Sequence, residues 1–184
     1  MNPSPLISHA TAAVLSWPVA WYILNQRNRL EPHGAPLPEE IIARLRPYFE
    51  DLDLEHARIV IADPLPIPNP PFAEAVRRLG FDFPSVVLTA AITFDHVIAA
   101  RERMSPALLF HELVHVVQYR LLGVSAFARQ YVQGFLSGGS YHGIPLEGCA
   151  FTLERRFVAE SRPFRVESGS SGLDEPISPV MEQI

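Results

Sequence analysis

Two histidines and a glutamate near the middle of the chain have the types and the spacing of a metal-dependent hydrolase. The segment from His111 to His115 reads H-E-L-V-H and fits the pattern H-E-x-x-H. Residues four apart on an α-helix lie above one another on one face, so the two imidazoles can bind one Zn²⁺. Glu112 lies one step round the helix, where its carboxylate can hold a metal-bound water without binding the metal. The segment therefore predicts two metal ligands and a general base.

The residues on either side of this motif favour a buried helix. Ser105 is a good N-cap, Pro106 suits the first helical position, and Gly123 suits the C-cap. The helix is apolar nearly all round, through Leu108, Leu109, Phe110, Leu113, Val114, Val116 and Val117. Buried histidines and glutamates need partners, which a metal would provide. The alternative is two core histidines bonded to the backbone and a glutamate that faces solvent.

A tetrahedral catalytic zinc needs a third protein ligand and leaves its fourth position to water. The metzincin pattern requires a glycine and a histidine where this chain has Gln118 and Leu121, so that class is excluded. A second helix is predicted from Leu146 to Phe157, entered through Pro145. Glu147 lies in its first turn beside small residues, which let two helices approach closely. We therefore expect Glu147 to be the third ligand.

Three other side chains compete with Glu147 for this role. Glu154 lies seven residues later on about the same helical face, but it adjoins two arginines and is expected to be a solvated ion-pair partner. His142 lies in a glycine-rich loop, which positions a ligand less rigidly. Cys149 is two residues from Glu147, about 200° round the helix, so both cannot face one metal. By default a lone buried cysteine behaves as a small hydrophobic residue.

The two motif segments together resemble a known family. Residues Phe110 to Gln118 read F-H-E-L-V-H-V-V-Q, and Ile144 to Ala150 read I-P-L-E-G-C-A. This pair is similar to the predicted metallopeptidase domain of extracellular contractile injection system core proteins. More broadly, the chain resembles a small gluzincin, the thermolysin-like group of zinc metallopeptidases. The resemblance covers about residues 40 to 160 and is strong only in the two motif segments.

This resemblance implies His111, His115 and Glu147 as zinc ligands and Glu112 as the catalytic base. Thermolysin-like enzymes often place an aspartate four residues after the third ligand, where this chain has Phe151. The carboxylate that usually supports a metal ligand is therefore missing or comes from elsewhere in the chain.

The predicted function is hydrolysis of peptide bonds by a zinc-activated water with Glu112 as the general base. The tetrahedral oxyanion needs a further donor, for which Tyr141 and His142, just before the second helix, are the nearest candidates. Gln118 is expected either to orient a ligand or to form a hydrogen bond within the core. Two other classes stay open: a catalytically degenerate zinc-binding module that acts in protein interaction or assembly, and a structural protein without metal.

Composition limits the remaining possibilities. With 184 residues, 48% of them hydrophobic, the chain is long enough for one globular domain with a real core. A net charge of −5 argues against a nucleic-acid partner, which would require a basic stripe. The single cysteine excludes an intramolecular disulfide framework and fits a reducing compartment, so the expected location is the cytoplasm. The expected partner is a peptide or protein substrate; the oligomeric state is not predicted.

Residues 6–24 are largely apolar but lack the basic start and the cleavage site of a signal peptide. His9, Ser16 and Pro18 make this run a poor membrane span. We expect a helix that packs on the domain or lies at a membrane surface. Trp17, Trp21 and Tyr22 would form its aromatic side, so a peripheral or anchored membrane association stays open.

The expected fold is α+β and zincin-like. A small antiparallel or mixed sheet packs on the helix with the H-E-x-x-H motif, and a second helix carries the glutamate ligand. The expected organisation is an N-terminal helix and linker (1–37), the metallopeptidase domain (38–166) and a disordered tail (167–184). The patterns also predict helices over 39–49, 72–79 and 126–136, a strand over 57–62, and a hairpin of strands 89–94 and 97–100 that turns at Asp95-His96.

Overall fold

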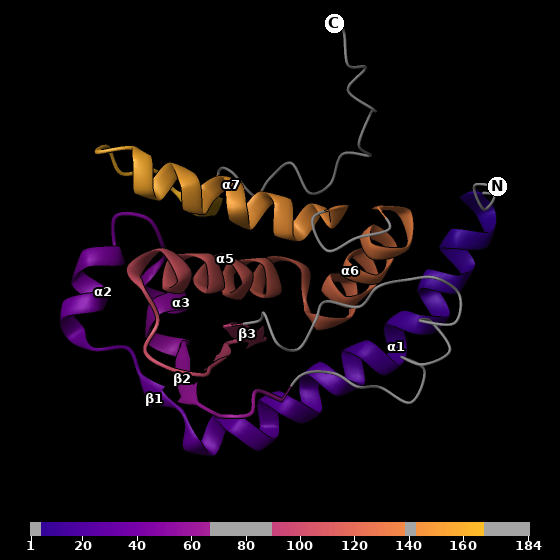
Figure 1. The fold of residues 1–184 in the computed structure, drawn as a ribbon, viewed down its shortest axis with the longest axis horizontal. Helices are drawn as coiled ribbons and strands as arrows, with labels where there is room; N and C mark the ends of the chain where they lie inside the picture. Colours follow the sequence, from indigo (N-terminus) through magenta and orange to yellow (C-terminus); the bar gives the residue numbers. More distant parts are fainter. Residues whose placement is uncertain (1–4, 67–89, 139–142, 168–184) are drawn as a thin grey trace, which may run out of the picture.

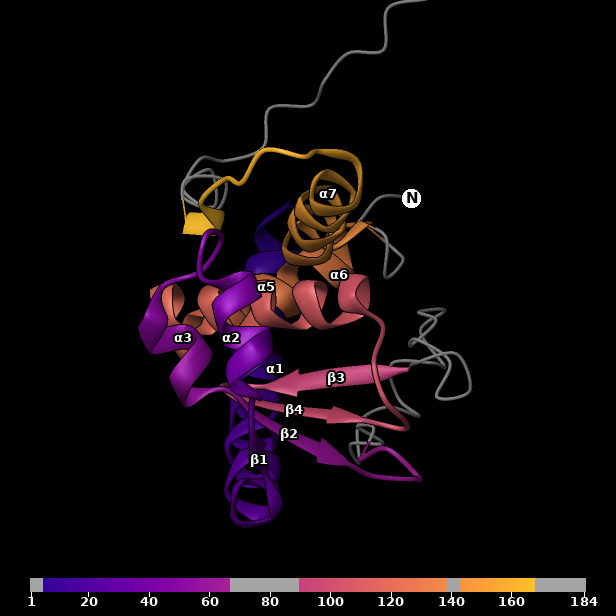
Figure 2. The same ribbon diagram turned by 90° about the vertical axis from the view of Figure 1, so that its left-hand side faces the viewer.

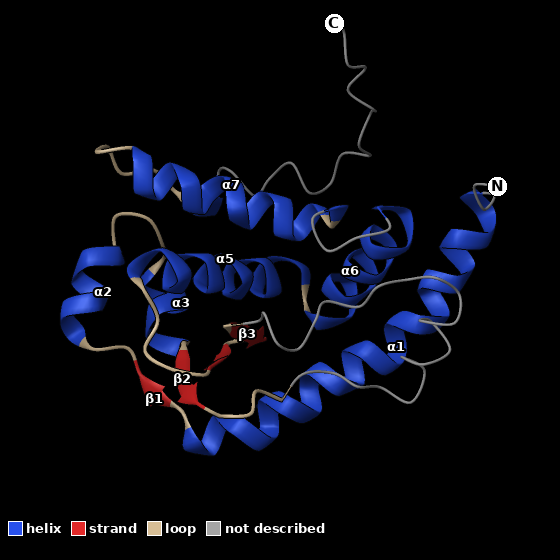
Figure 3. Ribbon diagram, in the orientation of Figure 1, coloured by secondary structure: helices blue, strands red, loops and turns tan. Residues whose placement is uncertain are grey.

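The structure, a computed structural model, describes residues 5–66, 90–138 and 143–167. Within these residues six α-helices accompany a four-stranded sheet, so the fold class is α+β as predicted (Figure 1; Figure 3). The elements in chain order are α1 (Pro5–Leu30), the 3₁₀ turn η1 (Glu31–His33), β1 (Ala35–Pro36), α2 (Glu39–Leu45), α3 (Asp51–His56), β2 (Arg58–Ile61), β3 (Ala91–Phe94), β4 (Val97–Ala100), α5 (Pro106–Leu122), α6 (Val124–Gly138) and α7 (Pro145–Ala159).

The sheet has the strand order β1-β2-β4-β3 and is mixed, because β2 and β4 run parallel while the other two pairs are antiparallel. All four residues of β4 are buried, as expected for a central strand that is covered on both faces. β3 and β4 form the predicted hairpin, and Asp95 in its turn has φ 60°, a conformation that Asp tolerates better than most residues. β3 ends the strand order and lies next to α5.

The helices lie on both faces of this sheet. Figure 2 shows α5 above the strands and α7 above α5, while α1 passes on the opposite face. Two apolar clusters fill the space. One joins α2, α3, α5 and α7 around Phe110, and the other joins α1, α6 and the β3–β4 hairpin around Phe94. α5 contributes to both clusters, which explains why its sequence is apolar on nearly every side.

The boundaries of α5 agree with the predicted capping residues. The Ser105 side chain accepts a hydrogen bond from the Leu108 amide, Pro106 occupies the first turn, and Gly123 ends the helix with φ 74°. The helix predicted over 39–49 is shorter than expected. It ends at Leu45, because Pro47 has no N–H to continue the helical hydrogen bonds. The predicted helix over 72–79 lies outside the described residues, as does most of the tail predicted for 167–184.

α1 is longer than the apolar run in the sequence, and its two faces differ. Ala20 and Ile23 are buried in the second cluster, whereas Trp17 and Trp21 are 75% and 58% exposed. Pro18 lies within the helix. Among the described residues, no helix combines the length and the apolarity that crossing a bilayer requires.

Candidate metal centre

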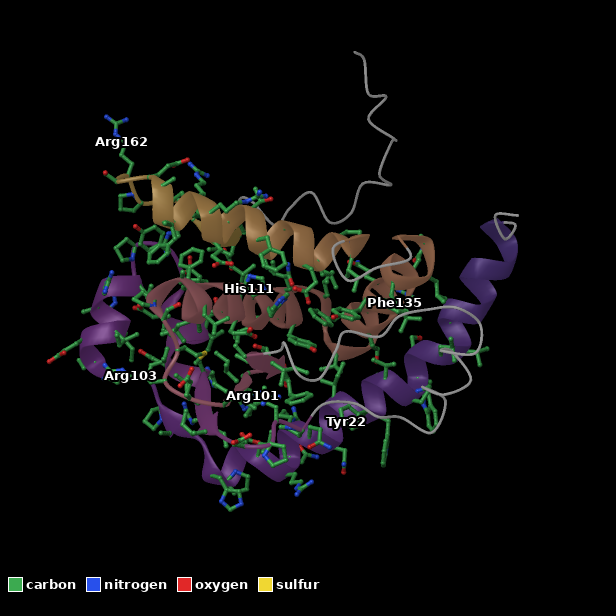
Figure 4. The ribbon with its side chains drawn as sticks, viewed as in Figure 1. Tyr22, Arg101, Arg103, His111, Phe135 and Arg162 are labelled. Atoms are coloured by element: carbon green, nitrogen blue, oxygen red, sulfur yellow. The ribbon has the colours of Figure 1, made fainter. Side chains whose placement is uncertain are left out.

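His111 and His115 lie in the middle of α5, on the side that faces α7. Both are buried, with 4% and 6% of their surface exposed. Figure 4 shows His111 in the layer between the two helices. The i, i+4 spacing places the two rings side by side on one face of the helix, edge to face, with centroids 4.9 Å apart and planes at 76°.

Glu147 reaches the same place from the first turn of α7 and is 4% exposed. A glycine permits a close approach between α6 and the start of α7, next to Glu147. A Cβ at Gly134 would lie 2.6 Å from Pro145 Cδ, whereas a Cβ at Gly148 would meet nothing within 4 Å. The glycine in the Glu147 segment is therefore not the small residue that close helix packing needs. Gly134 has that role.

Among the described residues, His111, His115 and Glu147 form the group of side chains that could hold a metal ion. The two Nε2 atoms are 3.2 Å apart, and Glu147 Oε2 lies 3.4 Å from each of them. Donors bound to a tetrahedral zinc at about 2.0–2.1 Å are separated by roughly 3.3–3.4 Å. The triangle of donor atoms thus has the size of one face of such a tetrahedron, and the residues present fit the ion.

Both histidines are oriented by acceptors at their other ring nitrogen. His111 Nδ1 lies 3.1 Å from Glu154 Oε2, and His115 Nδ1 lies 2.8 Å from Gln118 Oε1. Each acceptor favours a proton on Nδ1, which leaves the lone pair of Nε2 directed at the shared centre. Gln118 also donates from Nε2 to the Leu146 carbonyl, so one buried amide connects His115 to the residue that precedes Glu147.

The electrostatics of the group favour a cation. Burial lowers the pKa of His115, but the combined effects of Glu147, Glu112 and Gln118 outweigh burial and raise this pKa to about 9. Burial raises the pKa of Glu112, against the opposing effects of His115, Thr93 and His111. Two buried carboxylates need positive charge for compensation, which a protonated His115 supplies when no metal is bound and a divalent ion would supply in its place.

Glu112 lies beside this group without being one of its three donors. Its Oε2 accepts a 2.6 Å hydrogen bond from the hydroxyl of Thr93, on strand β3. The carboxylate is buried under α5, next to the edge of the sheet. This contact engages Oε2 and not Oε1.

The sequence identified part of this environment and missed part. Glu154, which we expected to be a solvated ion-pair partner, instead bonds to His111 and supplies the carboxylate missing at Phe151, whose ring packs 4.6 Å from His111. The sequence signal for this contact was the position of Glu154, which lies seven residues, or two helical turns, after Glu147 on about the same helical face. No motif pointed to Thr93, because its role depends on the position of the sheet under α5. Tyr141 and His142, the predicted oxyanion donors, lie outside the described residues.

Comparisons with protein-family models, curated proteins and solved structures give no match for this chain.

Proposed function

We propose that this protein is a zinc-dependent metallopeptidase of the gluzincin type. In this proposal His111, His115 and Glu147 are the zinc ligands, Glu112 is the general base, and the fold is a small zincin-like arrangement. The observation that carries the proposal is the triangle of three buried donor atoms at 3.2, 3.4 and 3.4 Å, the spacing of tetrahedral zinc ligands. Two histidines and one carboxylate are the ligand set of thermolysin-type catalytic zinc.

When bound, zinc supplies Lewis acidity, which polarises a carbonyl and lowers the pKa of water. The chain provides the other functions. Glu112 accepts a proton from the attacking water at Oε1 and returns it to the leaving amine. Glu154 and Gln118 keep the two imidazoles in the tautomer and orientation that ligation needs.

Metal analysis of the purified protein tests the ligand set. The parent is expected to contain about one zinc per chain, and His115→Ala and Glu147→Ala are expected to lose it, because each removes a direct ligand. Cys149→Ser, which changes a neighbour of Glu147, is the matched control and should keep the metal. Loss of zinc in Cys149→Ser with full occupancy in Glu147→Ala would overturn the assignment.

Hydrolysis of a quenched peptide library or a denatured protein tests the activity. Glu112→Gln keeps the shape of the side chain but removes the base, so zinc content should stay and turnover should fall by about 10²–10⁴-fold. Equal turnover in parent and variant would contradict the mechanism. A parent that holds zinc and cleaves nothing would instead support a zinc-binding module without catalysis.

A further inference from the structure

We propose that Thr93, on strand β3, is a positioning residue that fixes the Glu112 carboxylate for proton transfer. This inference rests on the proposed peptidase function. It concerns a residue outside the two motif segments, on the strand that ends the sheet beside α5.

The contact between the two side chains is short and buried. Thr93 Oγ1 donates to Glu112 Oε2 over 2.6 Å, a length typical of a hydroxyl bonded to an ionised carboxylate. Oγ1 also lies 3.3 Å from the Glu112 carbonyl oxygen. Since a hydroxyl has one hydrogen, the shorter contact is the main bond. With Oε2 held in this way, rotation of the carboxylate is restricted and Oε1 keeps one direction.

Thr93 is itself held by the same helix. Its carbonyl accepts a 3.3 Å hydrogen bond from the hydroxyl of Tyr119, which lies seven residues after Glu112 on α5. The ring of Tyr119 stacks on Phe127 of α6, with centroids 3.7 Å apart. Thr93 thus bonds to α5 twice, through its side chain at Glu112 and through its carbonyl at Tyr119, two helical turns later. Because Tyr119 also packs on α6, contacts with both α5 and α6 fix the position of the Thr93 hydroxyl.

The register of the hairpin explains why the backbone N–H and C=O of Thr93 are not used in hydrogen bonds to β4. The Arg101 amide donates to the Ala90 carbonyl, so these two opposite residues belong to the hydrogen-bonded set of the hairpin. Bonded and non-bonded pairs alternate along an antiparallel ladder, so Thr93, paired with Ile98, belongs to the non-bonded set. Its N–H and C=O therefore point away from β4, which lets the Tyr119 hydroxyl reach the carbonyl.

Four proteins test this role: the parent, Thr93→Val, Glu112→Gln and the double variant. Valine keeps the branched shape of threonine but removes the hydroxyl. With zinc content unchanged, Thr93→Val should lower kcat by about 10- to 100-fold with little change in KM, because a misplaced group costs rate and not binding. In the Glu112→Gln background the same substitution should cause almost no further loss, since the base on which it acts is gone. Thr93→Ser restores the hydroxyl and should retain most of the parent kcat.

A second readout uses the same proteins without metal and without substrate. Loss of the hydroxyl leaves a buried carboxylate oxygen without its donor, so Thr93→Val should lower Tm. The loss should be smaller in the Glu112→Gln background, because a neutral amide is a weaker acceptor than a carboxylate. Equal losses in both backgrounds would show that the contact does not exist and would overturn the inference.

The two readouts separate the possible failures. Parent-like kcat in Thr93→Val, or independent effects of the two substitutions on kcat, would overturn the positioning role while leaving the peptidase proposal intact. A zinc-loaded parent that hydrolyses no peptide would reject the peptidase proposal. The positioning role would then be rejected too, and coupled Tm losses would define a structural contact only.

Discussion

At the scale of single residues, the candidate metal centre depends on a few buried polar contacts in an apolar layer. Each histidine has an acceptor at Nδ1, Glu112 has a donor at Oε2, and Gln118 is bonded at both ends of its amide. Buried polar groups without partners cost about 1–3 kcal/mol each, so this completeness is needed for stability as well as for chemistry. It also explains how two histidines and Glu147 can be accommodated between α5 and α7, and Glu112 between α5 and β3.

Glu154 offers a test of these supporting contacts. Its carboxylate bonds to His111 Nδ1 and is 25% exposed, so its removal should not leave a buried cavity. We expect Glu154→Ala to lower zinc affinity by about 10- to 100-fold, the usual effect of losing a partner of a ligating histidine. Competition with a chromophoric chelator measures the affinity. Glu160→Ala, which removes the partner of Arg156 on the surface, is the control and should bind zinc like the parent. Unchanged affinity in Glu154→Ala would show that this contact does not support the ligand.

At the scale of elements, the β3–β4 hairpin is the part that joins the two sides of the molecule. One face of the hairpin contacts α5 through Thr93, and its turn is bonded to the end of α1 and to η1. Arg27 of α1 lies 2.9 Å from Asp95, and His96 lies 3.0 Å from Glu31. The turn therefore orients the strand that carries Thr93 relative to the N-terminal helix.

The charges at this turn predict a pH dependence of stability. The hydrogen bond with His96 lowers the pKa of Asp95, and the bonds with Asp95 and Glu31 raise that of His96 in spite of burial. The His96 contribution is present below its unfolded pKa of about 6.5 and is lost as the pH rises through the higher folded value. The Asp95 contribution is present above about pH 4 and is lost as the pH falls through the lower folded value.

The Tm difference between the parent and His96→Asn should therefore be largest between about pH 4 and 6.5 and should decrease towards pH 9. Thermal unfolding of both proteins over this range gives the result. The other histidines titrate in the same way in the parent and in His96→Asn, so their contributions to Tm cancel in the difference. A difference that is constant with pH would show that His96 is not charged in the turn.

At the scale of the whole molecule, segments far apart in sequence complete the core around α5. Phe164 packs on Tyr48 and Phe110, and the Val166 amide donates to the Tyr48 carbonyl. Glu167 bonds to Arg120, which also holds the buried Asp53 at 2.6 Å. The described C-terminal residues are thus part of the folded unit up to Glu167.

Truncation should reveal this boundary. A chain that ends after Glu167 keeps these contacts and should retain the Tm and the zinc content of the parent. A chain that ends after Pro163 loses two buried apolar side chains, worth about 1.5–3 kcal/mol each. Its Tm should fall by roughly 2–4 °C for each kcal/mol. A large loss of Tm in the chain that ends after Glu167 would show that residues 168–184 also stabilise the domain.

The sequence by itself determined the local parts of this protein. The ends of α5, the proximity of His111 and His115 on one helical face and the β3–β4 hairpin depend on capping, helical period and turn residues, which act over a few positions. The α+β class was predictable for the same reason. Glu147 could be proposed from its place in a second helix, but its distance to the histidines could not.

Only the tertiary structure decided which side chains surround the candidate metal centre. Glu154 and Thr93 come from a different helix and from a strand, and Gly134 sets the close approach of α6 to the start of α7. These contacts depend on how the sheet and three helices pack, and packing distances are not encoded in any local pattern. A carboxylate beside two arginines looks solvated in sequence, and it becomes a partner of His111 only because α7 turns that face towards α5.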